Sequence, residues 1–321
     1  MAKATLSATG KESDFSGLPG IGPLGEEKLK AAGYDTLMSL SLATPDQLTN
    51  ETGMATLMAN RIVREARQKI NGNGFTSCFD ELQKEQDTTI KIPTGSAALD
   101  SLLGGGVETG SITEAYGQNS SGKTQLAFQL AVNLNSLSRD YVTAFIDTEN
   151  TFRASRIKEI AECRKLDVKS VLNSIRLVRA IDTNDMNFYV EKIKELIGQG
   201  QNVKLVVIDS LMSHFRAEYT GRSVLAERQQ KIAVLLHTLK KYARLYNFAV
   251  YLTNQVMTKP DQFFGDPTVA IGGNVVSHFS HYRLYLRIGR KEARIAKLTD
   301  SSNMPEGEAC FLITQGGITD S

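Results

Sequence analysis

Hydrophobic and polar positions follow two patterns along the chain, and the pattern changes near residue 90. Before this point, apolar residues recur at helical spacing between glycine-containing turns. After it, short apolar and β-branched runs alternate with helical stretches. Four such runs cover residues 142–147, 175–180, 204–209 and 248–254. Strands that alternate with helices are typical of a mostly parallel sheet covered on both faces, so we predict an α/β fold for residues 90–321.

The helical patterns between these strands cover residues 155–165, 186–199 and 225–246. Ligands of such sheets bind beyond the carboxyl ends of the strands. Polar side chains follow three of the predicted strands at those ends, namely Asp147 with Glu149, Asp209 with Ser210, and Asn254 with Gln255. We expect these side chains to meet at one edge of the sheet.

Residues 15–72 are predicted to form a small all-α domain. Gly17–Gly22 permits a tight turn, Gly33 suits a helix end, and Thr44-Pro45 suits a helix start. The segment resembles a helix-hairpin-helix domain, in which hairpin amides bind a DNA phosphate. A weaker second hairpin at 51–55 precedes a basic helix. A small helical bundle with ordinary turns explains the same pattern, and the motif alone does not decide between the two.

Two segments flank this domain. Residues 1–14 are small, polar and unpatterned, which indicates a disordered tail. Residues 73–89 are predicted to be a linker, because they follow the turn sequence Asn71–Gly74 and are largely polar and charged. Phe75 is the conspicuous aromatic residue of this linker.

Length and composition indicate a globular protein and argue against a membrane-spanning or disulfide-rich one. The 321 residues allow about two domains, and 41% hydrophobic and 22% charged residues are ordinary for a globular protein. We see no membrane span and no leader, and expect a cytoplasmic protein. The three cysteines have no metal-site or disulfide spacing. The net charge of +2 means that a nucleic-acid role would depend on local basic patches.

A complete phosphate-loop motif follows the strand predicted at 110–116 and opens a helix predicted at 124–135. Its residues are Gly117, Gln118, Asn119, Ser120, Ser121, Gly122, Lys123 and Thr124. In such loops backbone N–H groups and the helix N-terminus bind phosphate, the lysine reaches the β- and γ-phosphates, and the hydroxyl binds Mg²⁺. The sequence therefore predicts an ATP site with Mg²⁺.

The strand ends supply the other groups of this site. Asp209 ends an apolar strand in a Walker B pattern and is expected to hold Mg²⁺, through water. Glu149 is the candidate general base for the attacking water, with a surface glutamate as the alternative. Asn254-Gln255 ends another strand, and a neutral amide there can bind the γ-phosphate and report its hydrolysis to the long segment 256–273, which has few regular signals.

Several motifs in this order resemble the archaeal and eukaryotic, RadA-type branch of the RecA-type recombinases. They are Gly117–Thr124, Phe145–Arg153, Leu205–Ser210, Tyr219–Arg222, Ala226–Gln230 and Ile271–Asn274. The resemblance covers nearly all of the chain from Gly17 to Ile318. It implies a RecA-like P-loop ATPase core after a small helix-hairpin-helix domain that binds DNA.

The resemblance also implies an activity. Subunits would assemble as a filament or ring, with ATP between neighbours, on single-stranded DNA. The filament would pair and exchange strands with homologous double-stranded DNA in DNA repair, on the nucleoid and with the help of mediator or paralogue proteins. ATP and Mg²⁺ are the implied cofactors, with a monovalent cation such as K⁺ as an open question near Asp300.

The resemblance assigns roles to individual residues. Glu149, Lys123 and Gln255 match catalytic positions, and Thr124 and Asp209 match the Mg²⁺ positions. Gln125, Arg156 and Asp300 match ATP contacts, in which Arg156 stacks on adenine and Asp300 lies in the cap over the neighbour's ATP. Gln255 and His278 match the positions that sense the γ-phosphate. Phe75 and Cys78 match the ends of a motif that docks into the next subunit.

Two segments match the DNA-binding loops of that branch, at 215–226 and 256–274. The candidate DNA contacts are Arg216, Tyr219, Arg222, Arg228, Lys259, Gly272, Gly273 and Asn274. Basic groups neutralise phosphates without reading sequence, and aromatic groups stack on any base. The arginines fit a solvated surface as well, and Phe263 and Phe264 fit either DNA stacking or packing in the core.

Three other kinds of protein are alternatives to a recombinase. A paralogue or mediator would bind single-stranded DNA and ATP without strand exchange. A RecA-fold motor, such as a hexameric helicase, would show a priming or zinc module, and a generic P-loop kinase would lack the hairpin domain. The chain departs from the branch in four places: Asn150 replaces a glycine, Ala154-Ser155 a Pro-Glu pair, Ser302 a proline, and Cys78 a small residue.

Overall fold

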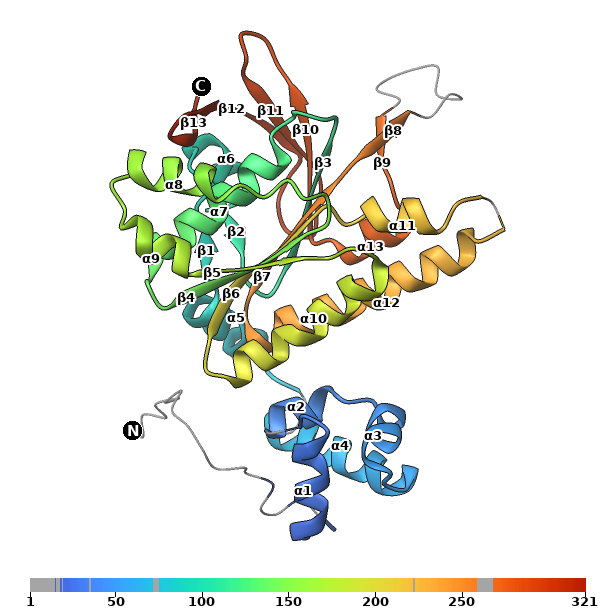
Figure 1. The fold of residues 1–321 in the computed structure, drawn as a ribbon. Helices are drawn as coiled ribbons and strands as arrows, with labels where there is room; N and C mark the ends of the chain where they lie inside the picture. Colours follow the sequence, from blue (N-terminus) through green and yellow to red (C-terminus); the bar gives the residue numbers. More distant parts are fainter. Residues whose placement is uncertain are drawn as a thin grey trace. The chain divides into compact units, whose positions relative to one another are not determined.

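A computed structural model describes residues 15, 18, 20–34, 36–71, 75–221, 223–258 and 268–321. The chain divides into two compact units, Met1–Gln86 and Asp87–Ser321 (Figure 1). Among the described residues, none of the helices combines the length and the apolar character that a bilayer span requires.

The first unit is helical, as predicted. Its helices are α1 (Pro23–Ala31), α2 (Leu37–Leu42), α3 (Pro45–Thr52) and α4 (Thr56–Asn71). Thr44 caps α3 by accepting a hydrogen bond from the Gln47 N–H, and Gly53 ends it in the left-handed conformation. A separate apolar core holds these helices together, built around Leu29, Leu40, Leu48 and Ile62.

Helix α5 (Cys78–Thr88) spans the division between the two units. This helix lies inside the segment that was predicted to be a linker. It buries none of its residues, which agrees with the exposure that its polar composition predicts. Phe75, just before it, is fully exposed, with Phe79 and Leu82 exposed on the helix itself.

The second unit contains a nine-stranded sheet in the order β13-β12-β11-β10-β3-β7-β6-β4-β5. Its strands are β3 (Ile112–Gly117), β4 (Tyr141–Asp147), β5 (Ile175–Arg179), β6 (Asn202–Asp209), β7 (Ala249–Asn254), β10 (Tyr282–Ile288), β11 (Arg294–Ser301), β12 (Gly307–Thr314) and β13 (Gly317–Asp320). The pairs from β10 through β3, β7, β6 and β4 to β5 are parallel, and those from β10 to β13 are antiparallel. The predicted mostly parallel α/β core is therefore confirmed.

Two short ribbons and eight helices complete the described part of this unit. The ribbons pair β1 (Lys91–Ile92) with β2 (Val107–Glu108) and β8 (Val256–Thr258) with β9 (Thr268–Ala270). The helices are α6 (Ala97–Leu102), α7 (Lys123–Leu137), α8 (Ala154–Cys163), α9 (Val168–Asn173), α10 (Thr183–Gly198), α11 (Ser213–Glu218), α12 (Leu225–Tyr246) and α13 (Asn274–Phe279).

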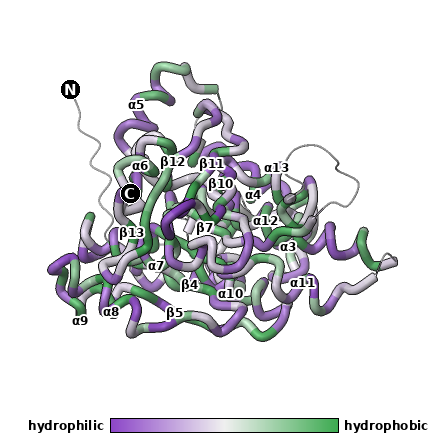
Figure 2. The backbone as a smooth tube through the Cα atoms, turned by 90° about the horizontal axis from the view of Figure 1, so that it is seen from above, coloured by the Kyte–Doolittle hydropathy of each residue, from purple (hydrophilic) through white to green (hydrophobic). Residues whose placement is uncertain are grey.

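Helices cover both faces of the sheet, and the central strands β3 and β7 are buried along their whole length. In β6, Leu205 and Val207 belong to the core cluster that contains α7, whereas the buried Val206 and Ile208 point to the other face. There α10 contacts β6, and α12 contacts β7. Figure 2 shows the outer helices alternating between hydrophilic and hydrophobic residues, as expected for helices with one face on the sheet.

The structure corrects one expectation from the sequence. The long segment after Gln255 is not irregular at its ends, because β8 and β9 pair as a ribbon with Val256 opposite Ala270. Its middle, residues 259–267, lies outside the described residues. Short three-residue strands carry too few positions to show a period of two, so the pattern did not reveal them.

Candidate nucleotide site

The phosphate loop connects β3 to α7, as the motif predicts. Ser120 and Gly122 have φ values of +63° and +106°, which turn the backbone sharply before α7 begins at Lys123. A Cβ on Gly117 would lie 2.1 Å from the Leu286 carbonyl oxygen, so only glycine fits there. Lys123 Nζ donates hydrogen bonds to the carbonyl oxygens of Gly117 and Gln118, both at 2.9 Å.

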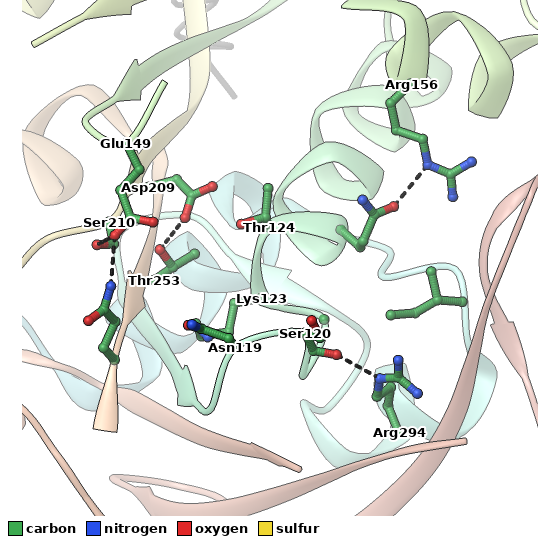
Figure 3. Close-up of a pocket in the computed structure, with 14 residues that line it drawn as sticks. Asn119, Ser120, Lys123, Thr124, Glu149, Arg156, Asp209, Ser210, Thr253 and Arg294 are labelled. Atoms are coloured by element: carbon green, nitrogen blue, oxygen red, sulfur yellow. Dashed lines mark hydrogen bonds between the residues drawn. The ribbon is translucent and has the colours of Figure 1, made fainter. Parts of the chain in front are cut away.

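A cavity of about 570 Å³ opens at this loop. It lies beyond the carboxyl ends of β4, β6 and β7, and Figure 3 shows Glu149, Asp209 and Ser210 on one side of Lys123 and Arg156 on the other. The lining residues are Asn119, Ser120, Gly122, Lys123, Thr124, Gln125, Glu149, Arg156, Asp209, Ser210, Thr253, Gln255, Arg294 and Ile313. Of the predicted strand-end groups, Glu149, Asp209, Ser210 and Gln255 therefore meet the phosphate loop in one pocket, whereas Asp147 and Asn254 are buried outside its lining.

Burial perturbs the two central charges of this pocket. It lowers the pKa of Lys123, and the nearby carboxylates of Asp209 and Glu149 partly offset this effect. Burial also raises the pKa of Asp209, although the hydroxyls of Thr253 and Thr124 act in the opposite direction. A bound anion and a divalent cation would relieve these two penalties, respectively.

The oxygen atoms around Asp209 suit Mg²⁺. Thr253 donates a hydrogen bond to Asp209 Oδ1, whereas Oδ2 is buried without a hydrogen-bond partner in the described part of the chain. The described residues contain no cluster of three or more His, Cys, Asp or Glu side chains that could hold a metal ion. One carboxylate and the Thr124 hydroxyl fit Mg²⁺, because this ion keeps several waters and takes few protein ligands.

Glu149 is held at the edge of the pocket by two side chains and by its own loop. Its Oε1 accepts hydrogen bonds from Ser210 Oγ at 2.7 Å and from Gln255 Nε2 at 2.9 Å. Asp147 anchors the loop, since its buried carboxylate accepts the backbone N–H groups of Glu149, Thr151 and Phe152. Asn150 has a φ of +55°, a conformation that asparagine tolerates better than most residues, so it can stand in for glycine.

Arg156 is fixed by contacts on three sides. It donates to Gln125 Oε1 at 2.9 Å and to the carbonyl oxygens of Thr314 and Gln315 at 2.6 and 2.7 Å. Gln125 therefore belongs to the predicted site as a residue that holds Arg156. A guanidinium held by its edges presents a flat face, which is the geometry that stacking on a nucleobase requires.

Arg294 lines the pocket and was missed from the sequence. Its Nε donates to the Ser120 carbonyl oxygen at 3.0 Å, so it supports the phosphate loop from β11. It lies 174 positions from Ser120 along the chain, and no motif surrounds it. An arginine at the start of a strand after a basic hairpin was the available signal, and by itself it is not specific.

None of the described candidate DNA contacts lines the pocket, although Arg216 contacts one of the lining residues. Arg216, exposed on α11, donates to Gln255 Oε1 at 2.9 Å. Tyr219 accepts a hydrogen bond from Lys231, whose Nζ also lies 4.8 Å from the Tyr219 ring centre. Arg228 donates to the Tyr219 carbonyl oxygen at 3.5 Å.

The second segment contributes Gly272, Gly273 and Asn274, which lead into α13. The two glycines have φ values of +102° and +64°. Arg222, Lys259, Phe263 and Phe264 lie outside the described residues.

Four predicted residues do not join the pocket. His278 on α13 and Asp300 on β11 are exposed and are not among its lining residues. Phe75 and Cys78 are exposed in the segment that leads into α5. The roles predicted for them, γ-phosphate sensing by His278, capping of the neighbour's ATP at Asp300 and subunit docking by Phe75 and Cys78, stay predictions.

Comparison with known proteins agrees with this geometry. The Rad51 family matches residues 85–321. A curated relative, the DNA repair and recombination protein RadA of Metallosphaera sedula, is 44% identical over 310 residues, which cover 95% of this chain and 94% of the relative. The resemblance inferred from the motifs is thereby confirmed, and the chain belongs to the Rad51 family of RecA-like proteins.

Proposed function

We propose that this chain is an ATP-dependent recombinase that forms a helical filament on single-stranded DNA and exchanges homologous strands in DNA repair. Family membership and the name of the RadA relative support a role in recombination. The observation that carries the proposal is a chain of contacts from Glu149 through Gln255 to Arg216. It joins a hydrolytic group to a basic group outside the pocket, as a DNA-dependent ATPase requires.

The pocket residues would divide the work of ATP hydrolysis. Lys123 and the loop amides bind the β- and γ-phosphates, and Thr124 and Asp209 hold Mg²⁺, which supplies charge neutralisation at the phosphates. Arg156 and Gln125 position the base. Glu149 accepts a proton from the attacking water at its carboxylate, which Ser210 and Gln255 orient.

Gln255 gives this site a way to sense its occupant. Its Nε2 donates to Glu149 while its Oε1 accepts from Arg216, so both ends of the amide are engaged. A γ-phosphate that takes over the Nε2 contact would shift the amide and release Arg216 toward DNA. His278, Asp300 and the Phe75–Cys78 motif would act between subunits, with Asp300 near the neighbour's ATP and any monovalent cation.

The proposed activity implies binding partners and a location in the cell. The partners would be single- and double-stranded DNA, further copies of this chain and loading proteins, in the cytoplasm on the nucleoid. Arg222, Lys259 and the helical first unit would add DNA contacts to those of Arg216 and Arg228.

Homologous strand pairing tests the proposal. Single-stranded DNA coated with the protein in Mg²⁺-ATP is mixed with a labelled homologous duplex, and a heterologous duplex serves as the control. We expect displacement only with homology. DNA binding and ATP turnover without homologous displacement would contradict the proposal and would favour a mediator or motor protein.

A further inference from the structure

A buried carboxylate lies in the middle of the sheet, outside the residues that line the nucleotide pocket. Glu114 on β3 has a side chain that is 0% exposed. Its Oε2 accepts a hydrogen bond from Arg283 Nε on β10 at 2.7 Å, and its Oε1 accepts one from Asn254 Nδ2 on β7 at 2.8 Å. Since a buried charge without partners is costly, these contacts account for its presence. They also tie three adjacent strands together.

Asn254 carries this contact on to the second predicted DNA-binding segment. The same Nδ2 donates to the Ile271 carbonyl oxygen at 2.6 Å, and the Ile271 N–H donates to the Gln255 carbonyl oxygen at 3.0 Å. Ile271 is therefore held on both sides by the end of β7. It follows directly on β9, at the base of the ribbon that β9 forms with β8.

The backbone after Ile271 has little conformational freedom. Gly272 and Gly273 both have positive φ values, and a Cβ on Gly272 would lie 2.6 Å from Val276 Cγ2. The fixed residue Ile271 thus sets where the two glycines and the start of α13 lie. On the other side, Gln255 follows Asn254 directly and donates to Glu149 in the pocket.

We propose that Glu114 and Asn254 are positioning residues that anchor the base of the second DNA-binding segment to the sheet, beside the γ-phosphate sensor. They touch neither the nucleotide pocket nor an exposed surface. A buried ion pair is often no more stabilising than apolar residues of the same size, so stability alone does not account for a charge here. Through this anchor a displacement of Gln255 is transmitted to Gly272 and Gly273. The inference rests on the proposed DNA-dependent ATPase activity.

Three variants of the full-length chain distinguish a positioning role of Glu114 and Asn254 from a role in folding alone. In Glu114→Gln the shape is kept, but both carboxylate oxygens accept from donors, so the new amide nitrogen must face one of them. Asn254→Ala removes both donations and leaves the Glu114–Arg283 pair intact. Glu308→Gln is the matched control, because it makes the same change at an exposed pair with Arg287 in the same sheet.

Two measurements are made on each variant. Hydrogen exchange is followed for the peptide that covers 268–274, and ATP turnover is measured with and without poly(dT). For Glu114→Gln and Asn254→Ala we expect exchange at Ile271 to rise about tenfold while α7 stays protected. The KM for ATP and the DNA-free turnover should stay within about twofold, whereas stimulation by DNA should fall at least about fivefold. Glu308→Gln should change neither readout.

Several outcomes would overturn the inference. One is unchanged exchange at 268–274 together with unchanged stimulation by DNA in folded variants. Another is faster exchange throughout the sheet with a parallel loss of DNA-free turnover, which would show a merely structural role. A wild-type protein without any stimulation by DNA would contradict the proposed function instead, and exchange at Ile271 would still decide whether Glu114 anchors the segment.

Discussion

The nucleotide pocket and the two predicted DNA-binding segments differ in how their side chains are held. In the pocket, Lys123 and Asp209 are buried at the ends of regular elements. In the segments, Arg216 is exposed and bonds to a residue of the pocket rim, while Gly272 and Gly273 contribute only backbone. The pocket groups are thus fixed by burial within the fold, whereas Arg216 takes its position from a contact with the pocket rim.

This difference suits the two ligands. A nucleotide has one shape, and binding groups fixed in advance lose little entropy when it binds. Single-stranded DNA of any sequence needs groups that neutralise phosphates and adapt to varied bases. Variants of the pocket should therefore have large effects on ATP, and variants of the segments smaller, salt-dependent effects on DNA.

Glu149→Gln should give the largest effect. Removing the general base is expected to lower ATP turnover by about 10²- to 10⁴-fold, because the amide cannot accept the proton of the attacking water. Affinity for ATP should be kept, as measured by equilibrium binding. Glu162→Gln, at an exposed pair with Lys158, is the control. Turnover close to that of the wild type would remove Glu149 from its role.

Lys123→Ala should weaken ATP binding by about 30- to 5,000-fold, since truncating one partner of a buried charge pair costs about 2–5 kcal/mol. Isothermal titration with a nonhydrolysable ATP analogue measures this loss. DNA binding without nucleotide should be unaffected. An affinity for ATP equal to that of the wild type would contradict the assignment of the phosphate loop.

Asp147→Asn should lower turnover about tenfold and leave ATP affinity nearly unchanged, because the loop that positions Glu149 loses charged acceptors. The melting temperature should fall as well, since an amide nitrogen would then face a backbone N–H. Asp167→Asn is a matched control, for this aspartate also accepts two backbone N–H groups, of Lys169 and Ser170, but caps α9 away from the pocket. Equal effects of the two variants would show that Asp147 has no special role.

Arg216→Gln should give the smallest effect, a fall of a few-fold in affinity for single-stranded DNA. The slope of log affinity against log salt should decrease by about 0.7 in magnitude, as expected for one lost phosphate contact. Affinity for ATP should not change. Arg139→Gln removes an exposed arginine between α7 and β4, at the opposite end of the sheet, and should leave the slope unaltered. A loss confined to particular sequences would rule out backbone recognition.

The sequence predicts functional groups that lie together in one motif better than groups that only folding brings together. The phosphate loop and Asp209 were identified because their chemistry needs contiguous residues or a strand end, and such patterns are visible in one dimension. Arg294 was missed because it reaches Ser120 only through strand pairing across the sheet. The Glu114–Asn254–Ile271 contacts were invisible for the same reason, since β3 and β7 become neighbours only in the folded sheet.

Local signals also decided which helices and strands could be predicted from the sequence. Thr44 and Pro45 marked the start of α3, because capping chemistry is local. Its end at Gly53 was not predicted, since residues 51–55 were assigned to a second hairpin. Helix α5 was missed because it buries nothing and so lacks an apolar stripe. The antiparallel strands β10 to β13 were not enumerated, although they make up one side of the sheet that supports the pocket.

The central claim is that the occupant of the pocket controls the DNA-binding segments through Gln255. The direct test is the affinity for single-stranded DNA without nucleotide, with ADP and with a nonhydrolysable ATP analogue, in the wild type and in Gln255→Ala. The account predicts at least about tenfold tighter binding with the ATP analogue in the wild type and nearly none of this difference in Gln255→Ala. Equal affinities in the three states of the wild type, or a full difference in Gln255→Ala, would contradict it.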